Sequence, residues 1–315
     1  MWKRIFILVF VFIILTGCAM NNNPSHTSDK NNCQSGIIAV YAINNSQSPI
    51  RKVIILIDVA SKQVDNFTTN SVFQMSFSPK EHKIAFSQVY LDINGIDLAL
   101  LDVSNGNITR VENKFDDFHP VWSPTGDELI YISGPEFSFE LHKLDVVQMT
   151  SSIISLPFSD KYKHIVPMDW NEKYILFRGH LNSETDLSSD SFIFFQPDTN
   201  KWFVGYESSD HVSTVLFSPS ASILLIEEGG DPADSKNPPD IFFYDWGKNE
   251  KIDIPEIQGW SRSPAWSPDG NCLAFLYNSQ IVIFSFETKK IESIYDAPDK
   301  NMNFWYLDWG DDANN

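Results

Sequence analysis

Six copies of one short phrase recur along the chain, and each places an aromatic residue at the end of a short apolar run. Successive aromatic residues lie 45, 48, 47, 49 and 43 positions apart. A period in the forties with about four β-type runs per period is typical of a β-propeller. We therefore predict an all-β fold, a six-bladed propeller of four-stranded antiparallel blades. The copies are Phe77-Ser78-Pro79, Trp122-Ser123-Pro124, Asp169-Trp170-Asn171, Phe217-Ser218-Pro219, Trp266-Ser267-Pro268 and Asp308-Trp309-Gly310.

Each repeat has the same internal order, which the copy around Trp122 illustrates. Residues 120–122 form a predicted first strand, and the tight turn that follows has Pro124 to preset φ and Gly126 to supply a left-handed position. Further strands are predicted at 128–133, 139–145 and 152–156. The aromatic residue on the first strand would wedge between adjacent blades. We interpret it as a packing residue and not as part of a ligand site.

The phase of the repeat predicts how the ring closes. The chain opens with strands of the second, third and fourth type at 37–43, 53–59 and 63–67, and no first-type strand precedes them. It ends with one unmatched first-type strand at 303–309. The C-terminal strand is therefore expected to join the N-terminal blade as its innermost strand. Such closure removes an exposed sheet edge.

The N-terminus predicts export and lipidation. Lys3 and Arg4 precede an apolar run at 5–15, which is shorter than the roughly 20 residues needed to span a bilayer. The run ends in Leu15-Thr16-Gly17-Cys18, which resembles a bacterial lipobox. We predict a lipoprotein signal peptide at 1–17, lipid such as palmitate on Cys18 and attachment to a bacterial membrane on its exported side. An uncleaved anchor helix and an ordinary secretory signal are the alternatives.

The rest of the chain divides into three predicted parts. Residues 18–36 are rich in Asn and Ser and read as a flexible tether, 37–309 as the propeller and 310–315 as an acidic tail. Removal of Lys3 and Arg4 with the signal leaves 21 basic residues against 41 acidic ones, a net charge of −20. Such acidity argues against a nucleic-acid partner and against a polybasic membrane surface.

Two cysteines remain once Cys18 carries lipid. Cys33 and Cys272 each precede or begin a predicted second strand, in blades one and six. Those blades are neighbours in a closed ring, so an exported protein can join the two residues in a disulfide. The alternative is that Cys272 is a free cysteine buried in the core.

The turn phrases resemble the TolB-type propeller repeat. The resemblance rests on 122–126 and 266–270, each followed by an apolar strand, and on Lys83-Ile84-Ala85-Phe86, and it covers about 37–309. Blade four departs from the pattern because Asp169-Trp170-Asn171 lacks Ser-Pro. The resemblance implies a propeller and, by loose analogy, a place in the cell envelope. It is nearly silent on activity, although some propellers of this kind are lyases of pectin fragments that use channel histidines.

Four polar residues stand just before predicted first strands, at His119, His164, His211 and Arg262. In propellers of this type such positions tend to lie at the mouth of the central channel, where they would hold an anionic ligand or a metal. The plainer alternative is that they cap turns. Trp260 and Trp305 lie in loops on the same face, which also carries the long connections at 179–190 and 228–240. An exposed Trp there is a candidate for contacting a partner, and the alternative is that either Trp packs under its loop.

No motif in the sequence assigns a catalytic residue, a metal site or a cofactor. Gly259-Trp260-Ser261-Arg262-Ser263 lacks the final glycine of a nucleophile elbow, and no H-E-x-x-H sequence is present. Our first hypothesis is a lipid-anchored scaffold of the cell envelope that binds a protein, peptide or glycan. The alternative is an enzyme, a lyase or hydrolase, with a His-lined site in the channel.

Overall fold

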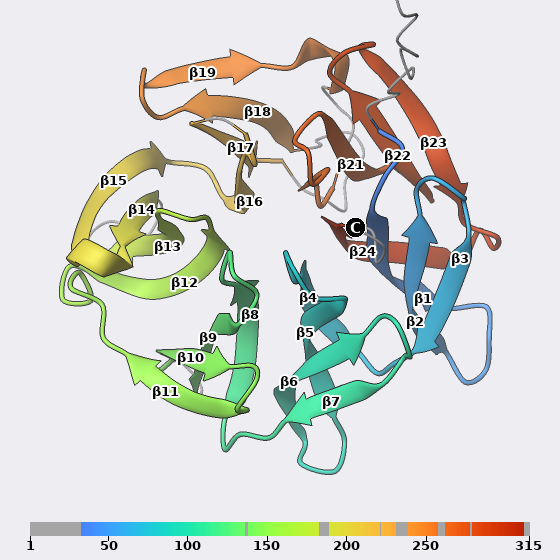
Figure 1. Ribbon diagram of the computed structural model, residues 1–315, viewed down its shortest axis with the longest axis horizontal. Helices are drawn as coiled ribbons and strands as arrows, with labels where there is room; N and C mark the ends of the chain where they lie inside the picture. Colours follow the sequence, from blue (N-terminus) through green and yellow to red (C-terminus); the bar gives the residue numbers. More distant parts are fainter. Residues whose placement is uncertain are drawn as a thin grey trace, which may run out of the picture. The chain divides into compact units, whose positions relative to one another are not determined.

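The computed structural model describes residues 33–135, 138–182, 189–220, 222–230, 239–257, 262–277 and 279–311. These residues form six four-stranded antiparallel sheets arranged as blades around a central axis, with the first strand of each blade innermost (Figure 1). The predicted six-bladed propeller is confirmed. The segment 1–32, which contains Cys18, lies outside the described residues. No helix in the described part of the chain is long and apolar enough to cross a membrane.

The strand bounds follow the repeat. Blade 1 consists of β24 (Met302–Gly310), β1 (Ile37–Asn44), β2 (Arg51–Asp58) and β3 (Val64–Thr68). Blade 2 consists of β4 (Val72–Phe77), β5 (Lys83–Tyr90), β6 (Gly95–Asp102) and β7 (Ile108–Val111). Blade 3 consists of β8 (Asp116–Trp122), β9 (Glu128–Gly134), β10 (Glu140–Asp145) and β11 (Thr150–Ile154).

The second half of the ring repeats this order and adds two short 3₁₀ turns, η1 (Pro197–Thr199) and η2 (Pro255–Ile257). Blade 4 consists of β12 (Tyr162–Trp170), β13 (Ile175–Leu181), β14 (Asp190–Gln196) and β15 (Lys201–Ser208). Blade 5 consists of β16 (Val212–Phe217), β17 (Ile223–Glu228), β18 (Asp240–Asp245) and β19 (Glu250–Asp253). Blade 6 consists of β20 (Ala265–Trp266), β21 (Cys272–Tyr277), β22 (Gln280–Ser285) and β23 (Lys290–Asp296).

The ring closes as predicted, because β24 pairs antiparallel with β1 from Ile37↔Gly310 to Asn44↔Met302. Gly310 therefore belongs to the propeller and not to the expected tail. The first strands also begin earlier than the sequence suggested, as β8 shows by starting at Asp116. The apolar run marks only the part of the first strand that packs between blades. The residues of β8 that precede this run are mostly polar.

Both faces of each blade are buried, which explains why the inner strands are nearly continuous apolar runs. In blade 2, Phe86 and Ala99 pack against blade 1, while Ala85 and Leu100 pack against blade 3. Complete burial of one Phe side chain contributes about 1.5–3 kcal/mol. Successive side chains of one strand point to opposite faces of the blade, so a single strand contributes to the packing of two blade interfaces.

The Ser-Pro turns are fixed by their serine side chains. Ser123 Oγ accepts a hydrogen bond from Glu128 N at 3.1 Å, and Ser267 Oγ accepts one from Cys272 N at 2.9 Å. Gly126 continues the first of these turns at φ 72°, a left-handed conformation that glycine adopts without strain. This shared bonding is the physical reason for the repeated phrase.

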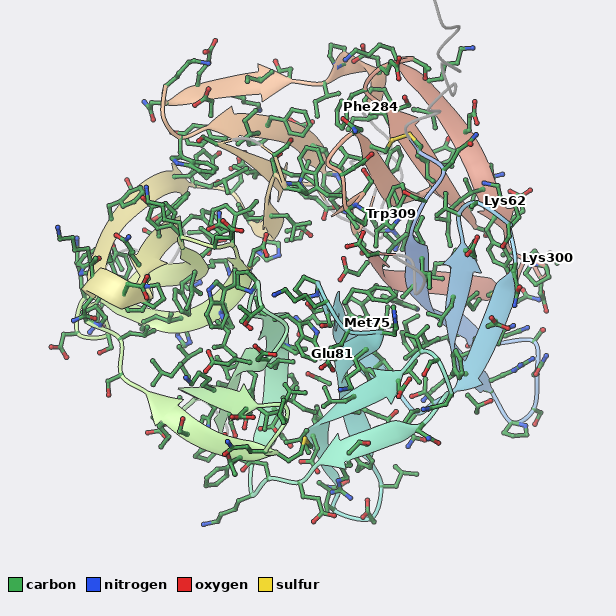
Figure 2. The ribbon with its side chains drawn as sticks, viewed as in Figure 1. Lys62, Met75, Glu81, Phe284, Lys300 and Trp309 are labelled. Atoms are coloured by element: carbon green, nitrogen blue, oxygen red, sulfur yellow. A yellow bond between two sulfur atoms is a disulfide. The ribbon has the colours of Figure 1, made fainter. Side chains whose placement is uncertain are left out.

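Residues 33–36 are held against the propeller, although the sequence predicted that they belong to a flexible tether. Cys33 forms a disulfide with Cys272 at a Cα–Cα distance of 5.9 Å (Figure 2). Ser35 O accepts a hydrogen bond from Trp309 Nε1 at 3.1 Å, and Gly36 O accepts one from Val59 N at 3.0 Å. The chain is thus joined to the ring at the seam between blades 6 and 1.

Candidate functional site

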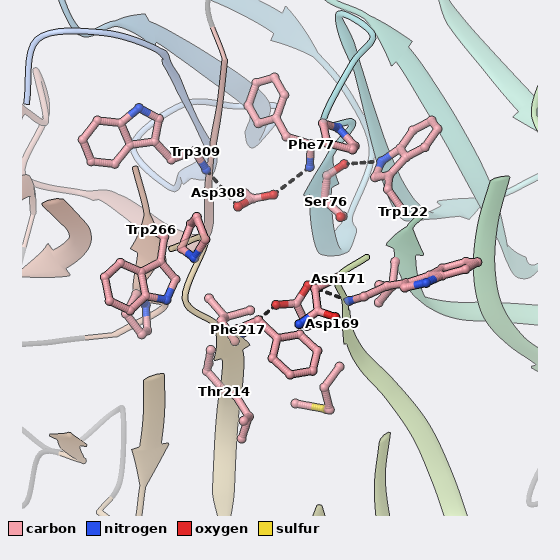
Figure 3. Close-up of a pocket in the computed structure, with 18 of the residues that line it drawn as sticks. Ser76, Phe77, Trp122, Asp169, Asn171, Thr214, Phe217, Trp266, Asp308 and Trp309 are labelled. Atoms are coloured by element: carbon pink, nitrogen blue, oxygen red, sulfur yellow. Dashed lines mark hydrogen bonds between the residues drawn. The ribbon is translucent and has the colours of Figure 1, made fainter. Parts of the chain in front are cut away.

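A cavity of about 1210 Å³ occupies the centre of the ring and is lined by residues of all six blades (Figure 3). Its two ends differ. The Ser-Pro end is lined by the repeated aromatic and proline residues at the ends of the first strands. The opposite end, which we call the polar end, is lined by Gln74, His119, Arg178, Glu227 and Arg262. The middle is lined by first-strand residues, of which Met75, Met168 and Leu216 are partly exposed, whereas Val121, Val215 and Leu307 are buried in the clusters between blades.

Irregular backbone at the start of the first strands places two of the polar side chains. The β4–β5 register shifts between Phe73 and Met75, and Gln74 takes φ 47°. The β8–β9 register shifts between Phe118 and Val121, and His119 takes φ 55°. A bulge leaves a residue out of the ladder and re-aims its side chain, here into the channel. Such a conformation is uncommon for a residue other than glycine.

The two re-aimed side chains bind each other. His119 Nε2 lies 3.2 Å from Gln74 Nε2, and His119 N donates to Gln74 Oε1 at 3.3 Å. Burial deep in the ring, together with the nearby positive charge of Arg178, lowers the pKa of His119 to about 4. The imidazole is therefore neutral at pH 7, and its Nε2 accepts a hydrogen bond from the Gln74 amide.

Arg178 and Arg262 bring positive charge to the same end. Arg178 Nη1 donates to Val212 O at 2.8 Å, and its buried Nε lies 4.0 Å from Asp190 Oδ1, a buried carboxylate on the neighbouring strand β14. The guanidinium of Arg262 is attracted electrostatically by Glu227, and no hydrogen bond or ion pair to it is found in the described part of the chain. Both cations therefore retain donors for a ligand in the channel.

Glu227 is the acidic group of the polar end, and its side chain is buried in blade 5. Its Oε2 accepts a hydrogen bond from Thr214 Oγ1 at 2.8 Å. Burial raises the pKa of Glu227, while the hydrogen bond from Thr214 and the attraction of Arg262 oppose that rise. Glu227 faces Arg262 and the buried Asp190 faces Arg178, so each of the two guanidinium groups at this end has one carboxylate beside it.

At the Ser-Pro end, Asp169 and Asp308 each connect two blades (Figure 3). Asp308 Oδ2 accepts a hydrogen bond from Phe77 N at 2.6 Å, and Asp169 Oδ2 accepts one from Phe217 N at 2.7 Å. Burial raises the pKa of both carboxyl groups to about 6, although the backbone N–H groups they accept from oppose the rise. Both carboxyls lie deep in the ring, but solvent in the channel still reaches part of each side chain.

Solved structures share this architecture. TolB from Acinetobacter baumannii superposes with a TM-score of 0.67 at 14% sequence identity, over 88% of this chain and 67% of that chain. The chain has a TolB-like propeller fold. A chain of a nidogen/laminin complex (TM-score 0.58, 6% identity, 87% of this chain and 98% of that chain) and Kuenenia stuttgartiensis hydrazine synthase (0.60, 13%, 87% and 46%) are also similar. No family model matches the sequence, and no curated protein matches it closely enough to count as a relative.

Within the TolB-like propeller, the four residues predicted at the channel mouth do not converge. His119 and Arg262 line the cavity, whereas His164 and His211 are exposed outside its lining. The His164 ring packs edge-on against His180 with centroids 5.9 Å apart. Among the described residues, no group of three or more His, Cys, Asp or Glu side chains lies so as to hold a metal ion. Trp260 lies outside the described residues.

Sequence reasoning missed Arg178 and Glu227, because both lie on second strands of their blades, β13 and β17. A signal for each was present. Arg178 follows Ile-Leu-Phe, and Glu227 follows Leu-Leu-Ile, so each interrupts an apolar run that is otherwise typical of a buried strand. A charge in a buried strand is costly unless it is paired or faces a cavity, and that cost distinguishes these two positions from surface charges.

Proposed function

We propose that the protein is a lipid-anchored binding protein of the bacterial cell envelope, whose channel holds a carboxylate-bearing peptide segment of a partner protein. The observation that carries the proposal is the pair of arginines, Arg178 and Arg262, at one end of a cavity of about 1210 Å³. The chain as a whole has a net charge of −18. Positive charge inside an acidic protein creates a local preference for an anion, and guanidinium groups pair well with carboxylates.

A peptide fits the rest of the lining better than a sugar does. The middle of the cavity has partly exposed apolar side chains, those of Met75, Met168 and Leu216, which offer apolar contact rather than partners for many hydroxyl groups. Ligand sites of this size combine mostly apolar walls with a few placed polar groups. A peptide with apolar side chains next to its carboxylate matches this division.

The enzyme alternative is less well supported by the residue it depends on. A general base works best with a pKa near the operating pH. His119 has its pKa lowered to about 4 and is bonded to Gln74, so it is a weak base at neutral pH. These properties suit a neutral hydrogen-bonding group that positions a ligand.

The envelope location rests on the sequence of the N-terminus, which resembles a lipobox ending at Cys18, together with the TolB-like fold. An attached acyl chain contributes roughly 0.8 kcal/mol per buried CH₂, so two or three chains anchor a protein stably. Changing Cys18→Ser should move the protein from the detergent phase to the aqueous phase and remove the lipid mass. Unchanged partitioning would contradict the lipid anchor.

The binding proposal is tested with the soluble domain and three probes: a mixture of apolar hexapeptides with free C-termini, the same peptides amidated, and an oligouronate. We expect the free-acid peptides to bind at least about tenfold more tightly than the amides. Arg178→Ala and Arg262→Ala should each weaken that binding by about ten- to a hundredfold, since hydrogen bonds to charged groups contribute roughly 1.5–3 kcal/mol. Arg51→Ala, on an exposed strand end, is the matched control. Preference for the oligouronate, or equal binding by the variants, would overturn the peptide proposal.

A further inference from the structure

A second surface of the propeller exposes large apolar side chains away from the channel. Leu91 is 83% exposed, Ile93 47%, Phe115 37% and Phe139 43%, and all four belong to loops or strand entries of blades 2 and 3. We call these four residues the blade 2–3 patch. Singly exposed apolar residues are ordinary, but a cluster of them marks an interaction site.

Contacts between the loops connect parts of the patch at the entry to β8. A Cβ placed on Gly95 would meet both Asp116 Oδ1 and Ile93 Cδ1 at 3.1 Å, so Ile93 lies beside the entry to β8. Asp116 Oδ1 also accepts a hydrogen bond from Ile96 N at 2.8 Å. On the other side of that entry, the Phe118 ring packs edge-on against Phe139 with centroids 5.8 Å apart. Ile93 in the β5–β6 turn and Phe139, which precedes β10, therefore both adjoin the entry to β8.

The patch lies at the end of the blades opposite the place where the N-terminal segment joins the ring. Cys33 is bonded to Cys272 at the start of β21, next to a Ser-Pro turn. Leu91 follows the far end of β5, an eight-residue second strand that starts beside the corresponding turn of blade 2. At roughly 3.3 Å per residue the two ends of such a strand are about 25 Å apart. The patch therefore lies at the opposite end of the blades from Cys33.

The charges around the patch specify the kind of partner. Asp92, Glu112, Asp116 and Glu140 are exposed beside it, and Asp92 is paired with Arg110 at 2.9 Å. The exposed cation Lys114 lies over the Phe115 ring at 5.1 Å, so the exposed acidic groups outnumber the cations around the patch. A second copy of this chain would bring the same acidic residues against them, and like charges across an interface are unfavourable. An acidic rim around an apolar centre is complementary to apolar side chains flanked by Lys or Arg.

We infer that the blade 2–3 patch is a docking surface for an apolar segment of another protein flanked by basic residues, and that this surface is separate from the channel. Apolar burial at the centre supplies the affinity, and the acidic rim supplies orientation and a faster encounter. The inference does not depend on a carboxylate ligand in the channel, so either binding site can be tested without the other.

The test uses two synthetic peptides with the same central Leu and Trp residues, one flanked by Lys and Arg and the other by Glu. We expect the basic peptide to bind the soluble domain at least about tenfold more tightly than the acidic one, with affinity falling as salt rises from 50 to 500 mM. Leu91→Asp and Phe139→Asp should each weaken the basic peptide by about tenfold or more. Val147→Asp is the matched control, because Val147 is 75% exposed in the β10–β11 turn at the other end of blade 3.

Two measurements keep the result unambiguous. Melting temperatures within about 2 °C of wild type would show that the variants are folded, and unchanged binding of the free-acid peptides by Leu91→Asp would show that the channel is intact. Equal binding of the two peptides, or equal binding by Leu91→Asp and Val147→Asp, would overturn the inference. A wild-type dimer in sedimentation that Leu91→Asp dissociates would also overturn it, because the occupant would then be a second copy.

Discussion

The two ends of the channel are built on opposite principles. At the Ser-Pro end the blades repeat the same chemistry, as Ser123 and Ser267 show by making equivalent hydrogen bonds in blades 3 and 6. At the polar end the blades contribute different side chains, such as Gln74, His119 and Arg262. A repeated residue has a role that every blade requires, in forming the turn and in packing against the neighbouring blades. A residue that occurs in one blade only has a role in the assembled channel.

The Ser-Pro end itself has two exceptions, and they are paired. Blades 1 and 4 lack Ser-Pro and instead place Asp308 and Asp169 before the tryptophan. Each carboxylate accepts a hydrogen bond from the first strand of the following blade, at Phe77 N or Phe217 N. These blades lie three positions apart in a ring of six, so the two connections are on opposite sides of the channel. If the Ser-Pro end is structural and the polar end is functional, substitutions at the Ser-Pro end should lower stability. Substitutions at the polar end should weaken ligand binding.

The largest effect is expected where the ring closes. Deleting 302–315 removes β24, with the buried residues Phe304, Leu307 and Trp309, and leaves β1 and two neighbouring blades exposed. We expect no cooperative thermal transition by circular dichroism, because exposed edges and lost apolar burial exceed the 5–15 kcal/mol that usually stabilises a domain. Deleting only 312–315 is the control and should leave the melting temperature within about 1 °C. A truncated protein that melts cooperatively at the wild-type temperature would refute six-bladed closure.

The next largest effect is expected at the same seam. The Cys33–Cys272 disulfide closes a segment with a sequence separation of 239 residues. Replacing both cysteines by serine should lower the free energy of unfolding by about 2–4 kcal/mol in urea titrations, and dithiothreitol should do the same to the wild type alone. Labelling of the denatured, unreduced soluble domain should find no reactive thiol at either position. Two reactive thiols would contradict the bridge.

A smaller, pH-dependent effect is expected from the Asp308 connection. Burial raises its pKa to about 6 from an ordinary value of 3.8, so the folded state binds the proton more tightly than the unfolded state does. The sign follows from linkage: this group's contribution to stability is full below about pH 4 and is lost as pH rises through about 6. Asp308→Asn cannot ionise, so its stability should fall less than that of the wild type between pH 4 and pH 7, by on the order of 1 kcal/mol because channel solvent screens the charge.

Urea titrations at half-unit pH steps measure this difference. The matched variant is Asp65→Asn, which makes the same substitution in the exposed outer strand β3. The Asn side chain has one oxygen in place of the two that accept from Phe77 N and Trp309 N, so Asp308→Asn should be less stable than the wild type at pH 4. Its stability should then change less between pH 4 and pH 7, which narrows the difference at pH 7. Parallel profiles for Asp308→Asn and the wild type would show that the carboxyl has no raised pKa.

The repeated end could be predicted from sequence, and most of the polar end could not. The regular spacing of the repeated aromatic residues predicted the six blades. The unmatched first-type strand near residue 303 predicted that the ring closes through blade 1. His119 lies three residues before Trp122 and faces the channel, but His164 and His211 lie six residues before Trp170 and Phe217 and stop outside it. The bulges that decide which side chain points inward depend on pairing between strands, which spacing does not reveal.

The smallest stability effect is expected at the polar end, and it tests the comparison most directly. The guanidinium of Arg262 makes no hydrogen bond with any residue that the structure describes, so Arg262→Ala removes an electrostatic attraction to Glu227 and little else. We expect the free energy of unfolding to change by less than about 0.5 kcal/mol, as is usual for substitutions that break no packing or buried bond. Binding of the free-acid peptides should nevertheless fall by about tenfold or more. A variant that loses several kcal/mol of stability would show that Arg262 is a structural residue, and the polar end would then differ from the Ser-Pro end in sequence but not in role.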